Sequence, residues 1–147
     1  MLASILVRSP MQAFRYGRHS VSRITIQLVC VTKYRRKVLD PAALAWLGQH
    51  FAKVCETMRC ELLACGGEAD HVHILIEYPP TVPVSVLVNA LKGTSSRLLR
   101  KERGDIARRY RDDAALWSPS YLAASTGSDT LDVVKRYVEQ QRASSSP

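Results

Sequence analysis

The chain has 147 residues, of which 46% are hydrophobic, and its 21 Lys and Arg outnumber its 13 Asp and Glu to give a formal net charge of +8. This length is typical of one domain with one core, and the sequence holds no apolar run near the roughly 20 residues that cross a bilayer. We therefore expect a cytoplasmic protein with no membrane contact and no signal peptide. The positive charge favours nucleic acid as the partner, because no basic helix with a strongly hydrophobic face is found.

Four cysteines stand at positions 30, 55, 60 and 65 and form no CxxC pair. In a reducing cytosol they stay as thiols and pack as small apolar residues. A structural zinc site is therefore not expected.

The first half of the chain predicts a strand, a helix and two further strands. β-Branched residues alternate over 23–32, and a basic turn follows at 33–37. Pro41 and apolar residues at three- and four-residue spacing predict an amphipathic helix over 41–58. Strands are then expected over 61–65 and 71–78, joined by residues 66–70, whose glycines suit a tight reversal.

The second half predicts two helices around one more strand. Apolar spacing indicates a helix over 84–103, and residues 115–125 read as a last strand broken by Pro119. Gly127 precedes an amphipathic helix over 129–142. The order β-α-β-β-α-β-α matches an α+β fold, a split βαβ (ferredoxin-like) antiparallel sheet with helices on one face and a C-terminal helix appended.

One domain over residues 16–142 is expected, with no internal repeat. Residues 1–15 read as a flexible N-terminal extension, and the Ser-rich residues 143–147 read as a disordered tail.

The segment around His71 and His73 is the first candidate for chemistry. Residues two apart in a strand point the same way, so both imidazoles project from one face. Two imidazoles on a rigid strand can bind a divalent cation and leave open positions for phosphate oxygens, with Mg²⁺ or Mn²⁺ suited to a nucleic-acid substrate. An H-x-H pair is also a common structural feature, so a purely structural role stays open.

Tyr137 and Gln141 form the second candidate, because a helix places residues four apart on the same face. A phenol is a poor nucleophile until a cation or base favours the phenolate, and Gln141 offers a neutral oxygen as a third metal ligand. Attack on phosphorus would give a phosphotyrosyl intermediate that permits strand transfer. The alternative is that Tyr137 simply packs at the edge of an apolar stripe.

Basic and aromatic residues supply candidate nucleic-acid contacts, although such runs are also common as solvated faces. These candidates are Lys33, Tyr34, Arg35, Arg36, Lys92 and Arg97. Ser118, Ser120 and Ser125 are not supported as nucleophiles, because no GxSxG elbow accompanies them.

Taken in order, several motifs resemble a known family. They are Tyr16-Gly17-Arg18-His19, Val31-Thr32-Lys33-Tyr34-Arg35-Arg36-Lys37, Asp70-His71-Val72-His73, Leu91-Lys92-Gly93-Thr94-Ser95-Ser96-Arg97, Trp117-Ser118-Pro119-Ser120-Tyr121 and Tyr137-x-x-x-Gln141. Over residues 16–141 this resembles the single-tyrosine HUH transposases, the TnpA-type enzymes of small bacterial insertion sequences that move as single-stranded DNA, and their REP-associated tyrosine transposase relatives.

The resemblance implies that His71, His73 and Gln141 hold the metal and that Tyr137 is the nucleophile. It implies cleavage to a 5′-phosphotyrosine and a free 3′-OH, which later rejoins strands. It also implies a homodimer, recognition of DNA hairpins at element ends, and a flexible joint at Gly127 before the tyrosine helix.

Three alternatives stay open. A domesticated relative would act with the same chemistry on chromosomal repeat hairpins. A noncatalytic nucleic-acid binding module would bind without metal dependence. A metal-dependent hydrolase would use the histidines to activate water and leave free ends without protein attachment.

Overall fold

The computed structural model describes residues 3–7, 14–110, 115–125 and 135–141, and residues 135–141 are helical. The other elements, in chain order, are β1 (Ala3–Val7), β2 (Arg15–Tyr16), β3 (Val21–Ser22), β4 (Ile24–Val31), the 3-10 turn η1 (Lys33–Arg35), α1 (Pro41–Thr57), β5 (Glu61–Glu68), β6 (His71–Tyr78), α2 (Val84–Glu102), α3 (Gly104–Arg108) and β7 (Leu122–Ala124).

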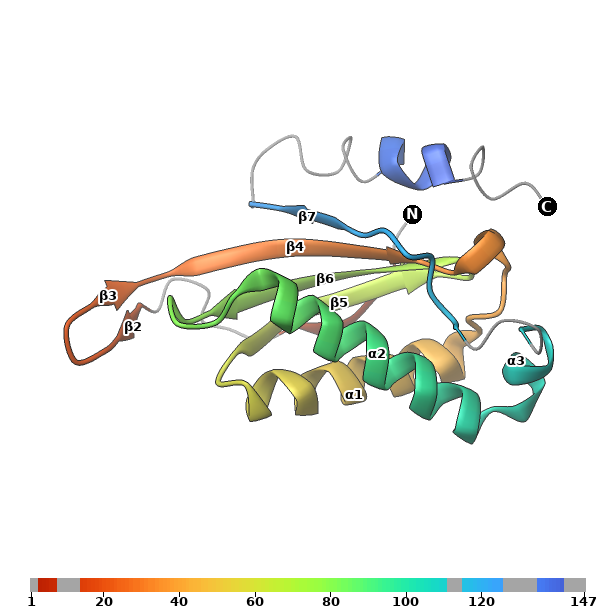
Figure 1. The fold of residues 1–147 in the computed structure, drawn as a ribbon, viewed down its shortest axis with the longest axis horizontal. Helices are drawn as coiled ribbons and strands as arrows, with labels where there is room; N and C mark the ends of the chain where they lie inside the picture. The colour runs from red at the N-terminus through yellow and green to blue at the C-terminus, as the bar shows by residue number, and fades with distance from the viewer. Residues whose placement is uncertain (1–2, 8–13, 111–114, 126–134, 142–147) are drawn as a thin grey trace.

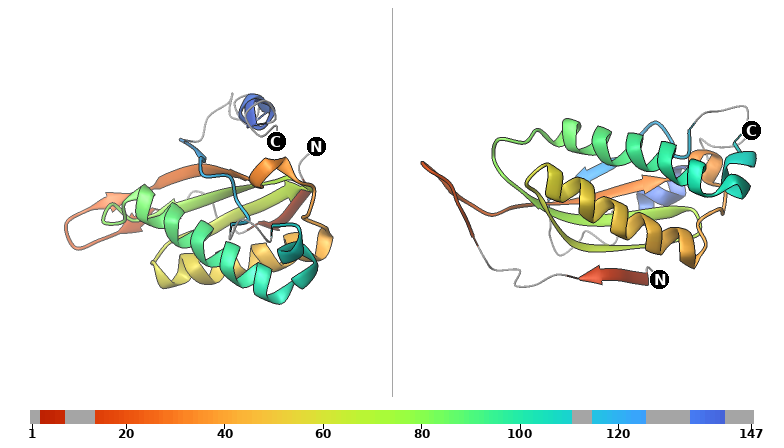
Figure 2. Two further views of the ribbon diagram at one scale, coloured as in Figure 1. Left: turned by 45° about the vertical axis from the view of Figure 1, so that its right-hand side comes forward. Right: turned by 90° about the horizontal axis from the view of Figure 1, so that it is seen from below.

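The main sheet has the strand order β1-β5-β6-β4-β7, and every neighbouring pair is antiparallel. Helices α1 and α2 cover one face of this sheet, and the helical residues 135–141 lie over the other (Figures 1 and 2). The order β5-β6-β4-β7 is that of a split βαβ unit, with β1 added at the edge beyond β5. The predicted fold class is therefore confirmed.

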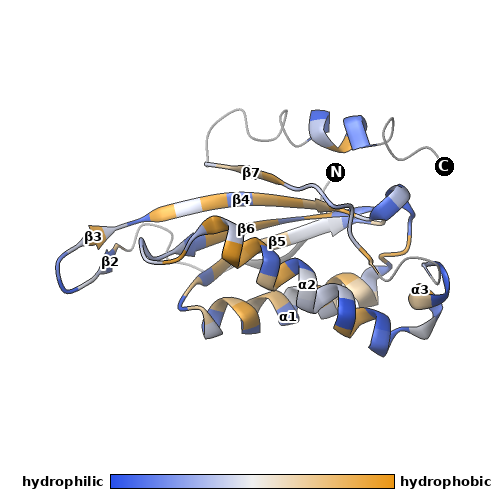
Figure 3. Cartoon of the chain, in the orientation of Figure 1, coloured by the Kyte–Doolittle hydropathy of each residue, from blue (hydrophilic) through white to orange (hydrophobic). Residues whose placement is uncertain are grey.

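Local sequence explains where α1 begins and which side it buries. Asp40 is the N-cap residue, its side chain accepts a hydrogen bond from the Ala43 amide at 2.8 Å, and Pro41 opens the helix. Leu47 and Phe51, one turn apart, are buried against the sheet. Both α1 and α2 carry hydrophobic and hydrophilic residues, as the alternating colours of Figure 3 show.

Strand β6 has two faces of different character. Val72, Ile74 and Ile76 are fully buried in the core beneath the helices, so His71 and His73 point to the other face. The four cysteines are free and buried, as expected, and burial raises the pKa of Cys30 to about 12.

The turn before β6 differs from the expectation. Residues 66 and 67 belong to β5, which runs to Glu68, and the reversal is confined to residues 69 and 70. A Cβ on Gly67 would lie 2.5 Å from the carbonyl oxygen of His71. This glycine therefore serves a close approach of two backbones rather than a turn.

Three further differences concern the ends of the fold. Residues 3–7, expected to be flexible, form β1 and pair with β5. The last strand is confined to β7, and before it Trp117 makes only an isolated bridge to Thr32, because Pro119 interrupts the ladder. Helix α3 was not predicted.

Gly127, the start of the predicted C-terminal helix and the tail over 143–147 lie outside the described residues. Among the helices that are described, none has the length and apolar character needed to cross a membrane.

Candidate active site

Strand pairing places His71 and His73 beside two valines of β4. His71 pairs with Val31, and His73 pairs with Val29. Directly paired residues of antiparallel strands project from the same face of a sheet. The two imidazoles and the two valines therefore share the face that α1 and α2 do not cover (Figure 1).

The ring of His71 is buried and oriented by acidic neighbours. Its Nδ1 lies 2.8 Å from Oδ1 of Asp70, and its Nε2 lies 3.7 Å from Oε2 of Glu68. Burial opposes ionisation of Asp70, but hydrogen bonds from His71 and Arg35 outweigh it and lower the pKa of this carboxyl. When Nδ1 carries the proton, the ionised Asp70 accepts a hydrogen bond from it, and the lone pair on Nε2 is left for a cation.

His73 is half-buried, and its Nδ1 has no hydrogen-bond partner among the described residues. Burial lowers the pKa of His73, and the neighbouring His71 lowers it further. The ring is therefore neutral at pH 7, the form that binds metals. A buried polar atom without a partner is costly, and a bound cation would remove that cost.

The C-terminal helix packs on the same face of the sheet. Val138 is buried against Val29 and Val31, and Leu122 and Tyr137 complete this small cluster. Because these valines pair with the two histidines, the Tyr137 helix lies over the H-x-H segment of its own chain.

Two serines hold the candidate residues of this helix. The Ser120 and Tyr137 hydroxyls are 2.7 Å apart, and the Ser118 hydroxyl donates to Oε1 of Gln141 at 2.9 Å. Burial raises the pKa of Tyr137, although the hydrogen bond with Ser120 opposes this effect. The phenol is therefore protonated at neutral pH.

Among the described residues, no group of three or more His, Cys, Asp and Glu side chains could hold a metal ion. A metal site here therefore needs a ligand of another type. The side chain of Gln141 carries an amide oxygen, which is a type of ligand that hard cations accept.

The predicted nucleic-acid residues of η1, together with the following residue Arg36, form an aromatic and basic turn. The Arg36 guanidinium lies between two tyrosine rings, 5.0 Å from the centre of Tyr34 and 4.8 Å from that of Tyr110. Tyr34 and Arg35 have left-handed backbones, with φ of 60° and 54°. Arg35 Nε donates to Asp70 at 2.7 Å, so this strained turn is tied to the residue that orients His71.

Lys92 and Arg97 do not join this group. The half-buried Lys92 turns its ammonium to the carbonyl oxygens of residues 118–120, and burial lowers its pKa. Arg97 is exposed on α2. Helix α2 covers one face of the sheet (Figure 2), and His71 and His73 project from the opposite face. The ammonium of Lys92 is thus used in a contact within the protein. Arg97 lies on the other side of the sheet from the histidines.

Sequence reasoning did not assign a role to Asp70, Ser118 or Ser120. Asp70 directly precedes His71, which is a usable signal, since metal-binding histidines commonly pair with a carboxylate. The serines carry no comparable signal, because their partners lie 17 and 23 residues further along the chain.

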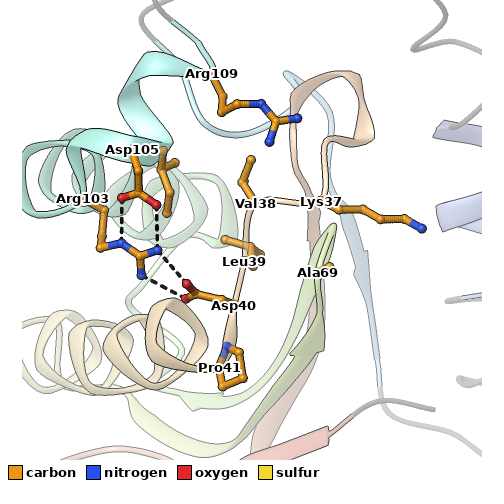
Figure 4. Close-up of a pocket in the computed structure, with 10 residues that line it drawn as sticks. Lys37, Val38, Leu39, Asp40, Pro41, Ala69, Arg103, Asp105 and Arg109 are labelled. Atoms are coloured by element: carbon orange, nitrogen blue, oxygen red, sulfur yellow. Dashed lines mark hydrogen bonds and ion pairs between the residues drawn. The ribbon is translucent and has the colours of Figure 1, made fainter.

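A pocket of about 600 Å³ lies apart from the predicted site residues, between the start of α1 and α3. Arg103 bridges the carboxylates of Asp40 and Asp105 at its wall (Figure 4). The wall of this pocket therefore holds an ion-pair network of one guanidinium and two carboxylates.

Comparisons with known proteins identify the family of this chain. Residues 20–141 match the family model described as "Transposase IS200 like". The transposase for insertion sequence element IS200 of Salmonella typhimurium LT2 is 31% identical over 118 residues, which cover 78% of this chain and 77% of that protein. The ISDra2 transposase TnpA of Deinococcus radiodurans is 26% identical over 125 residues, which cover 85% of this chain and 89% of that protein.

Solved structures show the same fold. A crystal structure of a candidate transposase from Deinococcus radiodurans R1 superposes with a TM-score of 0.81 at 28% identity, covering 86% of this chain and 97% of the other. A REP-associated tyrosine transposase bound to a REP hairpin superposes with a TM-score of 0.54 at 17% identity, covering 85% of this chain and 68% of the other. This is a likeness of fold. With a family match over most of its length, this chain belongs to the IS200-like transposases.

Proposed function

We propose that this transposase cleaves and rejoins single-stranded DNA at insertion-sequence ends, with Tyr137 as the nucleophile. The observation that carries the proposal is the packing of Val138 on Val29 and Val31, the pairing partners of His73 and His71. Family membership supports action on DNA, and the packing supports a tyrosine that works together with the two histidines.

We further propose that His71, His73 and Gln141 hold one Mg²⁺ or Mn²⁺ ion. The support is the oriented His71 ring, the unpartnered Nδ1 of His73 and the neutral oxygen of Gln141. When bound, the ion would supply positive charge to phosphate oxygens and lower the cost of forming a phenolate.

The proposed reaction is a transesterification. The Tyr137 oxygen attacks the phosphorus, a P–O bond to the tyrosine forms, and the bond from phosphorus to the 3′ oxygen breaks. The phenolic proton passes to solvent, and the leaving 3′ oxygen takes up a proton. The products are a 5′-phosphotyrosine and a free 3′-OH, and attack of a 3′-OH on a phosphotyrosine reverses the step and joins strands.

The proposed partner is single-stranded DNA that carries hairpins, bound by a homodimer. The η1 turn supports the contact with unpaired DNA, because Tyr34 is 39% exposed and lies beside the Arg36 guanidinium. Unpaired bases stack on such rings, while the basic side chains contact phosphate.

The experiment uses labelled single-stranded DNA with a hairpin, incubated with the protein and Mg²⁺ or Mn²⁺ and resolved on a denaturing gel. We expect a covalent adduct with the wild type and none with Tyr137→Phe. His71→Ala should abolish cleavage and leave hairpin binding largely intact, because phosphate contacts dominate affinity. Free ends without attached protein would instead indicate a hydrolase, and binding without cleavage would indicate a noncatalytic module.

A second candidate is the same chemistry on chromosomal repeat hairpins. The REP-associated relative is bound to a REP hairpin, and its fold is shared by this chain. Mapping hairpins in the flanking genomic DNA separates the two, because a mobile element requires them at both of its ends.

A further inference from the structure

Lys92, Ser118 and Ser120 form one connected structure against the C-terminal helix. Ser118 binds the Gln141 amide oxygen at 2.9 Å, and Ser120 binds the Tyr137 hydroxyl at 2.7 Å. The two helix residues to which the proposed function gives a chemical role are thus the two that these serines hold.

The loop that carries the serines is itself fixed by Lys92. The Lys92 ammonium donates to the carbonyl oxygens of Ser118 at 2.7 Å, Pro119 at 3.3 Å and Ser120 at 3.0 Å. An ammonium has three protons to donate, so these three oxygens account for its donors. Pro119 restricts the backbone further, because its ring fixes φ.

The same loop is attached to the sheet beside the histidines. The Ser118 amide donates to the carbonyl oxygen of Val31 at 2.7 Å, and Val31 pairs with His71 on its other side. Neighbouring strands lie about 4.8 Å apart, which places the Ser118 backbone about 10 Å from that of His71. Trp117 faces the opposite way, into the core, where its Nε1 donates to Ser95 at 2.9 Å.

We propose that Ser118 and Ser120 are positioning residues, which hold Gln141 and Tyr137 in one orientation over the histidines of their own chain. This inference rests on the proposed function, because it assumes that Tyr137 is the nucleophile. Val138 is the only buried side chain in helical residues 135–141, the described part of that helix. Tyr137 packs partly against the same cluster. Apolar contacts have no fixed direction, so they restrain rotation of the helix about its axis less than two hydrogen bonds one turn apart do.

The first test measures the rate of adduct formation at saturating hairpin DNA, together with the Kd for that DNA. We expect Ser120→Ala to lower the rate about 5- to 10-fold with an unchanged Kd, the effect of one lost hydrogen bond. Ser120→Thr should restore the rate because it keeps the hydroxyl. Ser22→Ala is the matched control, since the Ser22 hydroxyl is buried without a partner among the described residues. An unchanged or faster rate in Ser120→Ala overturns the inference.

The second test measures amide hydrogen exchange on the full chain without DNA or metal. In the double variant Ser118→Ala/Ser120→Ala, residues 135–141 should exchange about 10-fold faster or more, while α1 keeps its wild-type protection. Equal exchange in the two proteins overturns the inference. The exchange measurement does not depend on cleavage. A wild-type protein that forms no adduct would therefore refute the proposed function, whereas the exchange rates decide separately whether the two serines hold the helix.

Discussion

Asp70 and His71 are joined by a hydrogen bond of 2.8 Å between Oδ1 and Nδ1. The other carboxylate oxygen of Asp70 accepts from Arg35 Nε at 2.7 Å. One buried carboxylate therefore fixes both the imidazole and the neighbouring basic turn. Its two partners explain why it stays ionised although it is only 6% exposed.

We predict that Asp70→Asn weakens Mn²⁺ binding about 10- to 100-fold, the usual effect of removing the carboxylate behind a histidine ligand. Titration calorimetry in the absence of DNA measures this affinity. Asp105→Asn is the control, because Asp105 is an exposed acid that contacts Arg103 and none of the histidines. Wild-type affinity in Asp70→Asn would contradict the role assigned to this bond.

Gly67 and Gly93 should respond in opposite directions to alanine. A Cβ at Gly67 would meet the His71 carbonyl oxygen at 2.5 Å, whereas a Cβ at Gly93 meets nothing within 4 Å. We expect Gly67→Ala to lower the free energy of unfolding by about 1–3 kcal/mol, as overpacking does. Gly93→Ala should raise it by about 0.5–1 kcal/mol, because alanine favours a helix. Urea unfolding compares the two, and a neutral Gly67→Ala would show that β5 and β6 can separate without cost.

Because of the Asp40–Arg103 ion pair, we expect the free energy of unfolding to depend weakly on pH. The hydrogen bonds from Arg103 hold the pKa of Asp40 at about 2, below its usual 3.8. A lowered folded-state pKa stabilises the fold above about pH 4, and this contribution disappears as the pH falls towards 2. It should not exceed about 1 kcal/mol, because the pair is exposed to solvent.

Asp40→Asn tests this dependence, since asparagine is an equally good N-cap but lacks the charge and the second acceptor oxygen to which Arg103 donates. The difference in free energy of unfolding between wild type and variant should shrink from pH 7 to pH 2. A constant difference over that range would show that ionisation of Asp40 does not contribute to stability.

The sheet and its helices could be predicted because their signals are local. Val72, Ile74 and Ile76 alternate with the histidines at a period of two, which predicts a strand. In the structure the three apolar residues face the core, and the histidines project from the other face of the sheet. Gly67 was misplaced in the turn because a glycine that permits a close backbone approach looks the same in sequence as a glycine in a reversal.

The contacts that assemble the candidate site could not be predicted from the sequence in the same way. Spacing alone places Tyr137 and Gln141 on one helix face, but it does not say which loop receives them. Ser118 and Ser120 reach that helix only because Val31 binds one side of their loop and Lys92 the other. Such a relationship depends on tertiary structure, and a single sequence carries no trace of it.

If the η1 turn contacts DNA as proposed, its left-handed backbone at Tyr34 and Arg35 trades stability for that contact. Glycine or asparagine at position 34 would relieve the backbone and raise the melting temperature, but it would remove the ring that faces Arg36. Selection for thermal stability alone would therefore remove the Tyr34 ring, so its retention in an evolving population would support the proposed contact with DNA.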